Sequence, residues 1–287
     1  MDTTTSPASA ALRARLAEPG LVRVPGVYDG VSAHVARNAG FEVAFLTGAG
    51  VSASRYGVPD LGLITASELA DATSVIATSF GGPLIVDADT GFGEALNVTR
   101  TVETLERAGA AGIMLEDQVT SKRRCGHLAN KQVVPVEDYV AKLHAALAAR
   151  RAGTLIVART DSRGPLGIDA AIDRARTFAA EGADIVFIEA PTTLEEIERI
   201  ATDVTAAPLI FNAVPGGITP EVSEADLEQF GFRLVVYPAA LLFPSAQTMA
   251  DELTKLAGSP AQRITSPREL FETVGLSRWA ALEKSGF

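Results

Sequence analysis

Eight short apolar runs, separated by helix-like segments, constrain the fold of this chain more than any other feature. The runs are rich in Val, Ile and Leu, as expected for parallel strands that are buried on both faces. They cover residues 21–27, 43–47, 84–89, 112–117, 155–161, 185–190, 209–214 and 234–238. The alternation predicts an α/β fold, a single (β/α)8 TIM barrel over residues 11–256. A doubly wound open sheet is the alternative, but it normally has about six strands and a glycine-rich phosphate turn after the first, which this chain lacks.

Composition narrows the class of protein. The chain has 287 residues, 47% hydrophobic and 21% charged, which suits one barrel with a large core. A formal net charge of −10 argues against a nucleic-acid partner. A single cysteine excludes an intrachain disulfide and suits a reducing compartment. Residues 1–10 are small and polar, so we expect a flexible N-terminus without a signal peptide. No apolar run is long enough to span a membrane, and we expect a soluble cytoplasmic protein.

The tail at residues 257–287 follows the barrel and has an amphipathic pattern. Its apolar residues are Leu270, Phe271, Val274, Leu276, Trp279 and Leu282. Apolar surface of this extent requires a partner surface. The sequence allows two: a neighbouring subunit, or the outer ring of the chain's own barrel.

The residues that end each apolar run are where chemistry is expected, because active sites of such barrels lie at the carboxyl ends of the strands. These ends are polar or flexible: Tyr28-Asp29, Thr47-Gly48-Ala49-Gly50, Asp87-Ala88-Asp89, Glu116-Asp117, Arg159-Thr160-Asp161, Glu189, Asn212 and Tyr237. Helix capping explains some polar residues at such turns. It does not require three separate acidic strand ends.

Three carboxylates at these ends predict a metal site. Asp87 and Asp89 are two residues apart, so on a strand they project from the same face. Glu116 ends the next run, on a strand about 4.8 Å away. Oxygen ligands without a nearby histidine pair favour Mg²⁺, or Mn²⁺, over zinc. The alternative is that some of these carboxylates cap helices or pair with lysines.

Arg159 ends the following run and faces the same ring of strand ends. An arginine there is typical of a bidentate clamp for a substrate carboxylate or phosphate. A structural salt bridge to Glu189 or Asp161 is the competing interpretation. The strand ends together predict a metal-assisted reaction on a small anionic substrate.

Cys125 is the only cysteine and lies in Lys122-Arg123-Arg124-Cys125-Gly126-His127. Neighbouring positive charge favours the thiolate, which makes Cys125 a candidate nucleophile or proton donor. A solvated basic loop with an incidental thiol is the alternative. The loop, residues 118–131, is long enough to close over the site and exclude water.

Several motifs occur together in a family's order: YDGVSA (28–33), TGAGVSAS (47–54), PDLG (59–62), VDADTGFG (86–93), EDQ (116–118), RCGH (124–127), ARTD (158–161), IEA (188–190) and TP (219–220). With these motifs the chain resembles the isocitrate lyase/phosphoenolpyruvate mutase superfamily, in its 2-methylisocitrate lyase and 2,3-dimethylmalate lyase-like branch. The resemblance covers about residues 22–245.

The resemblance implies a barrel that assembles as a homotetramer, with the C-terminal helices exchanged between paired subunits. It also implies Mg²⁺ as the cofactor. Asp87 would hold this ion, and Asp60, Asp89 and Glu116 would grip it directly or through water.

The resemblance further assigns roles in the substrate site. Thr47, Gly48, Ala49 and Arg159 would bind an α-oxo acid portion, and Asn212, Thr219 and His127 would surround the departing carboxylate. Cys125 would protonate the enediolate released by carbon–carbon cleavage. The expected catalytic set is Cys125, His127, Arg159, Glu189 and Tyr28, and the substrate-binding set also includes Asp87, Arg124 and Gly126.

The implied function is a Mg²⁺-dependent lyase that cleaves a 2-hydroxy di- or tricarboxylate into pyruvate or glyoxylate and a second carboxylate. Oxaloacetate hydrolysis is the alternative, followed by carboxyphosphonoenolpyruvate mutase chemistry and a non-catalytic oxoacid-binding protein. Two departures affect the substrate. Pro215 stands where lyases of this family usually have a glutamate, and the loop has one more arginine before Cys125 than is usual.

Overall fold

The structure, a computed structural model, describes residues 5–122, 125–128, 130–258 and 263–285. Its eight parallel strands close into one barrel in sequence order, with β8 hydrogen-bonded to β1. The strands are β1 (Val22–Val27), β2 (Ala44–Leu46), β3 (Leu84–Asp87), β4 (Gly112–Glu116), β5 (Leu155–Thr160), β6 (Ile185–Ile188), β7 (Leu209–Asn212) and β8 (Leu234–Tyr237). Each lies within one of the eight predicted apolar runs, so the (β/α)8 prediction is confirmed.

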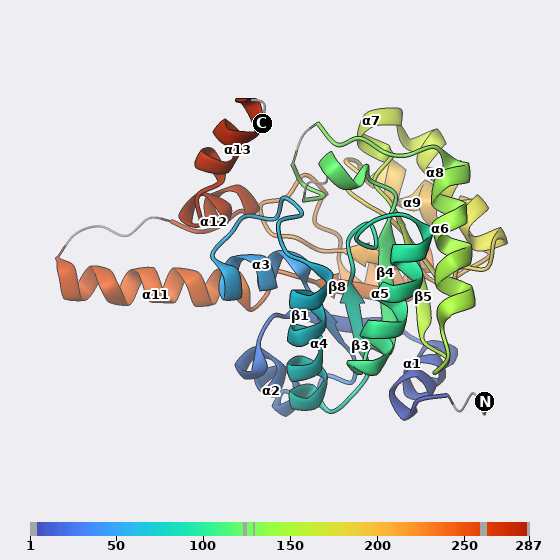
Figure 1. Ribbon diagram of the computed structural model, residues 1–287, viewed down its shortest axis with the longest axis horizontal. Coiled ribbons are helices and arrows are strands. Elements are labelled where there is room, and N and C mark those ends of the chain that lie inside the picture. Colours follow the sequence, from blue (N-terminus) through green and yellow to red (C-terminus); the bar gives the residue numbers. More distant parts are fainter. Residues whose placement is uncertain (1–4, 123–124, 129, 259–262, 286–287) are drawn as a thin grey trace.

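Helices surround the barrel and extend it at both termini (Figure 1). They are α1 (Pro7–Ala17), α2 (Gly30–Asn38), α3 (Gly48–Tyr56), α4 (Ala66–Phe80), α5 (Ala95–Arg107), α6 (Val136–Ala149), α7 (Arg163–Leu166), α8 (Ile168–Ala180), α9 (Leu194–Asp203), α10 (Glu224–Phe230), α11 (Leu242–Ala257), α12 (Pro267–Thr273) and α13 (Leu276–Lys284), with a short 3-10 helix η1 (Thr120–Lys122). Among the helices in these ranges, none combines the length and apolar character required to cross a bilayer.

Helix α1 closes the amino-terminal end of the barrel. Residues 7–10 belong to this helix, although the sequence predicted a flexible segment over residues 1–10. The reason is local: Ser6 caps the helix by accepting from the Ser9 amide, and Leu12 is fully buried in the barrel interior with Phe45 and Met114. The opposite end, where the strands terminate, therefore remains for the site.

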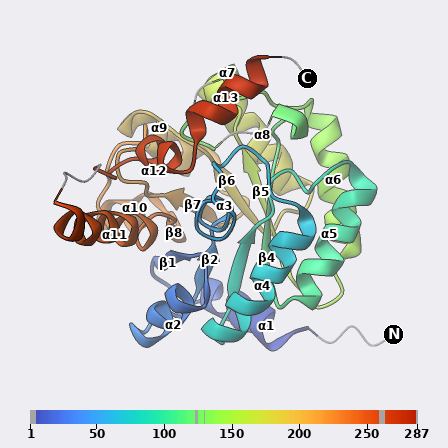
Figure 2. The same ribbon diagram turned by 60° about the vertical axis from the view of Figure 1, so that its left-hand side comes forward.

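The C-terminal helices differ in what they contact. Helix α11 projects from the barrel (Figure 1), and its Met249, Leu253 and Leu256 are 61%, 63% and 84% exposed. Helix α12 lies back toward the molecule (Figure 2), and its Leu270 and Phe271 are buried in the same core cluster as the barrel residues. Helix α12 thus packs on its own chain, at the rim of the barrel and not on the outer ring that the sequence offered as one of two surfaces. Exchange of helices between subunits stays a prediction.

Candidate active site

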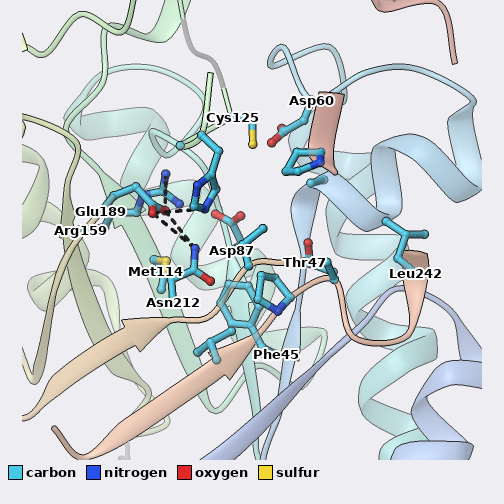
Figure 3. A pocket seen from close by; sticks show the side chains of 18 of the residues that line it. Phe45, Thr47, Asp60, Asp87, Met114, Cys125, Arg159, Glu189, Asn212 and Leu242 are labelled. Carbon is cyan, nitrogen blue, oxygen red and sulfur yellow. Dashed lines mark hydrogen bonds and ion pairs between the residues drawn. The ribbon is translucent and has the colours of Figure 1, made fainter. Parts of the chain in front are cut away.

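One cavity opens at the carboxyl ends of the strands and collects most of the predicted site residues. Its lining includes Thr47 after β2, Asp87 at the end of β3, Arg159 on β5, Glu189 after β6 and Asn212 at the end of β7, together with Ala49, Asp60, Cys125, Gly126 and His127 (Figure 3). These residues come from segments far apart in the chain. The closed barrel brings them together because every parallel strand ends at the same rim.

Helix α3 begins at this rim and directs its amino terminus to the cavity. Thr47 caps it, with the side-chain Oγ1 accepting from the Gly50 amide at 3.3 Å. Thr47 and Ala49 both line the cavity. The positive end of a helix dipole and the amides of its first turn favour an anion here. The position fits the predicted binding of an α-oxo acid carboxylate at residues 47–49.

The carboxylates of Asp87 and Asp89 both lie beside Gly48. A Cβ atom placed on Gly48 would lie 3.4 Å from Asp87 Oδ2 and 3.5 Å from Asp89 Oδ1. The two side chains do not share a strand face as predicted, because β3 ends at Asp87 and Asp89 has a left-handed backbone with φ of 51°. That turn brings the second carboxylate back toward the first. Both residues are buried, at 7% and 6% exposure.

The other two predicted metal ligands, Asp60 and Glu116, have contacts of their own. Asp60 lines the cavity beside Cys125, whose amide donates to the Asp60 carbonyl at 3.2 Å (Figure 3). Glu116 instead meets Arg159, with Nε and Oε2 3.3 Å apart, and accepts from Gln118. Within the described ranges, no three Asp, Glu, His or Cys side chains are arranged to hold an ion together.

A magnesium ion is nevertheless compatible with this arrangement. Mg²⁺ usually keeps several waters and takes only one or two protein carboxylates, with the substrate supplying further oxygens. Asp87 and Asp89 provide such a pair around the small Gly48. The donor set consists of oxygen atoms, which matches Mg²⁺ or Mn²⁺.

Arg159 is held in place by carboxylates on several sides. Asp161 grips it with two bonds, from Nε to Oδ2 at 2.8 Å and from Nη2 to Oδ1 at 3.0 Å. Glu189 Oε2 lies 3.1 Å from Nη2, and the guanidinium stacks over Phe187 at 5.4 Å from the ring centre. The competing structural salt bridges are therefore present. Arg159 also lines the cavity, so the same contacts orient it toward a ligand.

His127 lies on the other side of the Glu189 carboxylate from Arg159 and has a defined tautomer. Its Nδ1 accepts from the Ile218 amide at 3.3 Å, which places the proton of the neutral ring on Nε2. Nε2 is 3.7 Å from Glu189 Oε1. Burial is the main cause that lowers the pKa of His127 below its usual value, so the neutral ring is favoured.

Three buried polar atoms near this histidine make no hydrogen bond to any part of the chain that the structure describes. They are His127 Nε2, Asn212 Oδ1 and Thr219 Oγ1. Thr219 lines a neighbouring cavity that shares Asn212 and Val214 with the first and includes Pro215. Buried polar atoms normally have partners, so this set fits a polar ligand group. These are the residues expected around the departing carboxylate.

Tyr28 and Arg124 are the remaining two predicted residues. Tyr28 does not line the main cavity; it lines another one with Asp29, Ser54 and Arg55, because β1 ends at Val27 and the Tyr28 side chain packs against Gly50. Burial raises the pKa of its hydroxyl. Arg124 lies outside the described residues.

Sequence reasoning missed some of the lining. Pro267, Leu270 and Phe271 on α12 form an apolar wall of the cavity. The amphipathic pattern of the tail was the available signal, but it did not indicate which surface the tail covers. Lys131 was also missed, although a lysine with a nearly buried side chain, 5% exposed, closes the loop of Cys125.

Comparisons with known proteins agree with this geometry. Residues 12–257 match the family described as phosphoenolpyruvate phosphomutase. The chain is 45% identical to 2-methylisocitrate lyase of Aeropyrum pernix over 88% of this chain and 80% of the relative. It is 41% identical to 2,3-dimethylmalate lyase of Eubacterium barkeri over 86% of both chains. A structure of oxaloacetate acetylhydrolase with 3,3-difluorooxalacetate has a TM-score of 0.84 and 36% identity, covering 97% of this chain and 96% of that one.

Proposed function

The chain belongs to the phosphoenolpyruvate phosphomutase family, and on that basis we propose that it is a carbon–carbon lyase. Its substrate is a 2-hydroxy di- or tricarboxylate of the 2-methylisocitrate or dimethylmalate kind, and its products are an α-oxo acid and a second carboxylate. One observation carries the proposal. Cys125, Arg159, Asp87 and Asn212 line a single cavity at the rim of the barrel.

The proposal includes a divalent cation, Mg²⁺ or Mn²⁺. Asp87 and Asp89 would hold it, with Asp60 and Glu116 contributing through water. The bound cation would stabilise negative charge that develops on the oxygen of the substrate during cleavage. The support is the pair of buried carboxylates around Gly48 and the oxygen-only donor set.

The side chains divide the substrate between two parts of the site, the main cavity and its boundary with the neighbouring cavity that Thr219 lines. Arg159 and the first turn of α3 bind the α-oxo acid portion, because both present positive charge to the cavity. His127, Asn212 and Thr219 receive the other carboxylate, which is supported by one buried side-chain atom of each that makes no described hydrogen bond. Glu189 orients the Asn212 amide by accepting from its Nδ2 at 3.2 Å, and Glu189 Oε1 lies 3.7 Å from His127 Nε2.

Cys125 supplies the proton in this scheme. When the carbon–carbon bond breaks, the bonding electron pair stays on the α-carbon of the departing carboxylate. The Cys125 thiol then donates a proton to this α-carbon. The α-oxo product forms as the 2-hydroxyl loses its proton to solvent, and the Cys125 thiolate regains a proton from solvent, so the thiol is restored for the next cycle. The support is the position of Cys125 in the cavity lining, next to the groups proposed to hold that carboxylate.

Oxaloacetate hydrolysis to oxalate and acetate is the second candidate. The extensive structural similarity to oxaloacetate acetylhydrolase favours it, as does Pro215, which removes a carboxylate from the far end of the lyase pocket. A screen of 2-methylisocitrate, 2,3-dimethylmalate, isocitrate and oxaloacetate with Mg²⁺ tests both. Pyruvate or glyoxylate from a hydroxy acid supports the lyase; oxalate from oxaloacetate supports the hydrolase. No product from any of them contradicts both.

The proposal extends to a homotetramer in which α11 and the helices after it are exchanged between paired subunits. Its support is the stripe of Met249, Leu253 and Leu256, which spans two turns of a helix that projects from the barrel. An apolar stripe on a projecting helix is stabilised by burial against a second copy.

A further inference from the structure

Lys131 lies at the end of the loop that begins with Gln118, and its ammonium group joins two parts of the site. Nζ is 2.8 Å from the carbonyl oxygen of Gly126 and 2.8 Å from Asp161 Oδ1. The side chain is 5% exposed and that of Asp161 is fully buried. Hydrogen bonds of a buried charged group are strong because little water competes for them.

Asp161 links Lys131 to Arg159 because its carboxylate accepts hydrogen bonds from both side chains. The oxygen that accepts from Lys131, Oδ1, also accepts from Arg159 Nη2 at 3.0 Å, while Oδ2 accepts from Nε at 2.8 Å. The backbone amide of Asp161 donates to Asp117, which fixes the position of the carboxylate relative to β4. The position of the Lys131 ammonium therefore helps to determine the direction of the Arg159 guanidinium.

Gly126 links Lys131 to Cys125 and His127, because its carbonyl accepts from the ammonium group and these two residues are its neighbours in the chain. A Cβ atom on Gly126 would lie 2.6 Å from the Glu189 carboxyl group, so this backbone is seated directly on the floor of the cavity. The base of the loop is held as well, by the antiparallel bridge between Gln118 and Val133.

We propose that Lys131 is a positioning residue that holds the Cys125–His127 segment and Arg159 in one fixed relationship. The inference rests on the proposed function, since it gives a role to two groups assigned to opposite parts of the substrate. It assigns to Lys131 a role in alignment, in addition to its charge.

Charge compensation alone is the competing explanation. Glu116, Asp161 and Glu189 surround Arg159, so three carboxylates face one guanidinium, and Lys131 adds a second positive charge. In that case its loss lowers stability but leaves the Cys125 segment and the ligand site as they were. The two explanations predict different behaviour of the thiol.

The test uses Lys131→Met, with Lys142→Met as the matched control. Lys142 also has a nearly buried side chain, 4% exposed, and pairs with Glu94 at 3.8 Å on the outer helices, away from the cavity. Cys125 is the only cysteine, so alkylation of the intact protein by iodoacetamide reports this thiol alone. Rates are measured with Mg²⁺ and oxalate present, beside thermal unfolding and steady-state kinetics.

We expect alkylation to become about tenfold faster in Lys131→Met, because the lost charged hydrogen bond no longer holds Gly126. We expect kcat to fall by about 10²-fold with a smaller change in KM, because misaligned groups cost turnover more than binding. Lys142→Met keeps the parent alkylation rate and kcat. If Lys131→Met does not fold, Lys131→Gln retains a donor but is too short to span both acceptors, and the same acceleration is expected.

A folded Lys131 variant with the parent alkylation rate and the parent kcat, changed only in melting temperature, would overturn the proposal. A Lys131 variant with the parent alkylation rate but a reduced kcat would also overturn the proposal, because the Cys125–His127 segment would then be aligned independently of Lys131. The alkylation measurement needs no turnover. If the parent enzyme cleaves none of the candidate substrates, the proposed function fails while this test still gives an answer.

Discussion

Gly126 and Glu189 are in such close contact that no side chain fits between them: a Cβ on Gly126 would lie 2.6 Å from the Glu189 carboxyl group. Glu189 is 1% exposed and is held by Arg159 and Asn212, so it cannot retreat. The fit of the Cys125 segment over the cavity therefore depends on a glycine at position 126.

Gly126→Ala is expected to reduce kcat/KM by about 10²-fold, because the added methyl group lifts Cys125 and His127 away from the floor of the cavity. Gly164→Ala is the control, since its new methyl group would meet nothing closer than Lys131 Cε at 3.6 Å. Steady-state kinetics compares the two. Equal activity in both variants would contradict the tight seating of the segment.

Cys125→Ser is expected to retain Mg²⁺ binding and the fold but to lose about 10²- to 10⁴-fold in turnover, the usual contribution of a positioned general acid. A serine hydroxyl has a similar size and is a much weaker acid than a thiol. Product release is followed by coupled assay, and Mg²⁺ binding by calorimetry. Turnover near that of the parent would eliminate Cys125 as the proton donor.

Asp87→Asn is expected to weaken Mg²⁺ binding by at least about 10²-fold, more than the loss of a group that only orients a ligand. Asp89→Asn should act in the same direction. Asp173→Asn, whose side chain is 77% exposed on the outside, is the control. Titration calorimetry with Mg²⁺ alone reads the affinity. Unchanged affinity in both site variants would place the ion elsewhere.

Acidification is expected to loosen the contact between His127 and the loop of Ile218. Burial holds the pKa of His127 below its usual value of 6.5, so the unfolded chain takes up its proton first as pH falls. The contribution of the neutral ring to stability is therefore complete above about pH 6.5 and declines below it. Thermal unfolding between pH 5.5 and 7.5 should show a steeper loss for the parent than for His127→Gln. Parallel curves would contradict this assignment.

Leu253→Asp is expected to dissociate the proposed tetramer, because it places a charge in the exposed stripe of α11. Leu96→Asp is the control, since Leu96 is also exposed, at 86%, but lies on α5 beside the barrel. Light scattering after size-exclusion chromatography gives the mass of each. A parent that elutes as a monomer would refute the assembly proposal itself.

The periodicity of the sequence was sufficient to predict every strand of the barrel and its closed form, because strands buried on both faces leave little choice of residue. The side-chain arrangement at the rim was predicted less well. Asp89 reaches its partner through a left-handed turn after β3, and Glu116 turns to Arg159. Such choices depend on contacts between distant segments.

The same limit applies to the tail and to Lys131. The apolar residues of α12 predicted that the tail is buried, but only the packed structure distinguishes the rim of its own barrel from a neighbour. Lys131 resembles any loop lysine in the sequence, and its importance appears only when Gly126 and Asp161 are both within 2.8 Å.

Helix α1 closes the amino-terminal end of the barrel, and this determines the route by which substrate and products reach and leave the site. Leu12 is fully buried in the barrel interior, so among the residues that the structure describes no passage follows the barrel axis. Substrate must enter, and both products must leave, through the same opening of the cavity at the rim, beside the Cys125 segment and α12. Product release and binding of the next substrate therefore use one opening. A compound that stays bound in this opening blocks both steps.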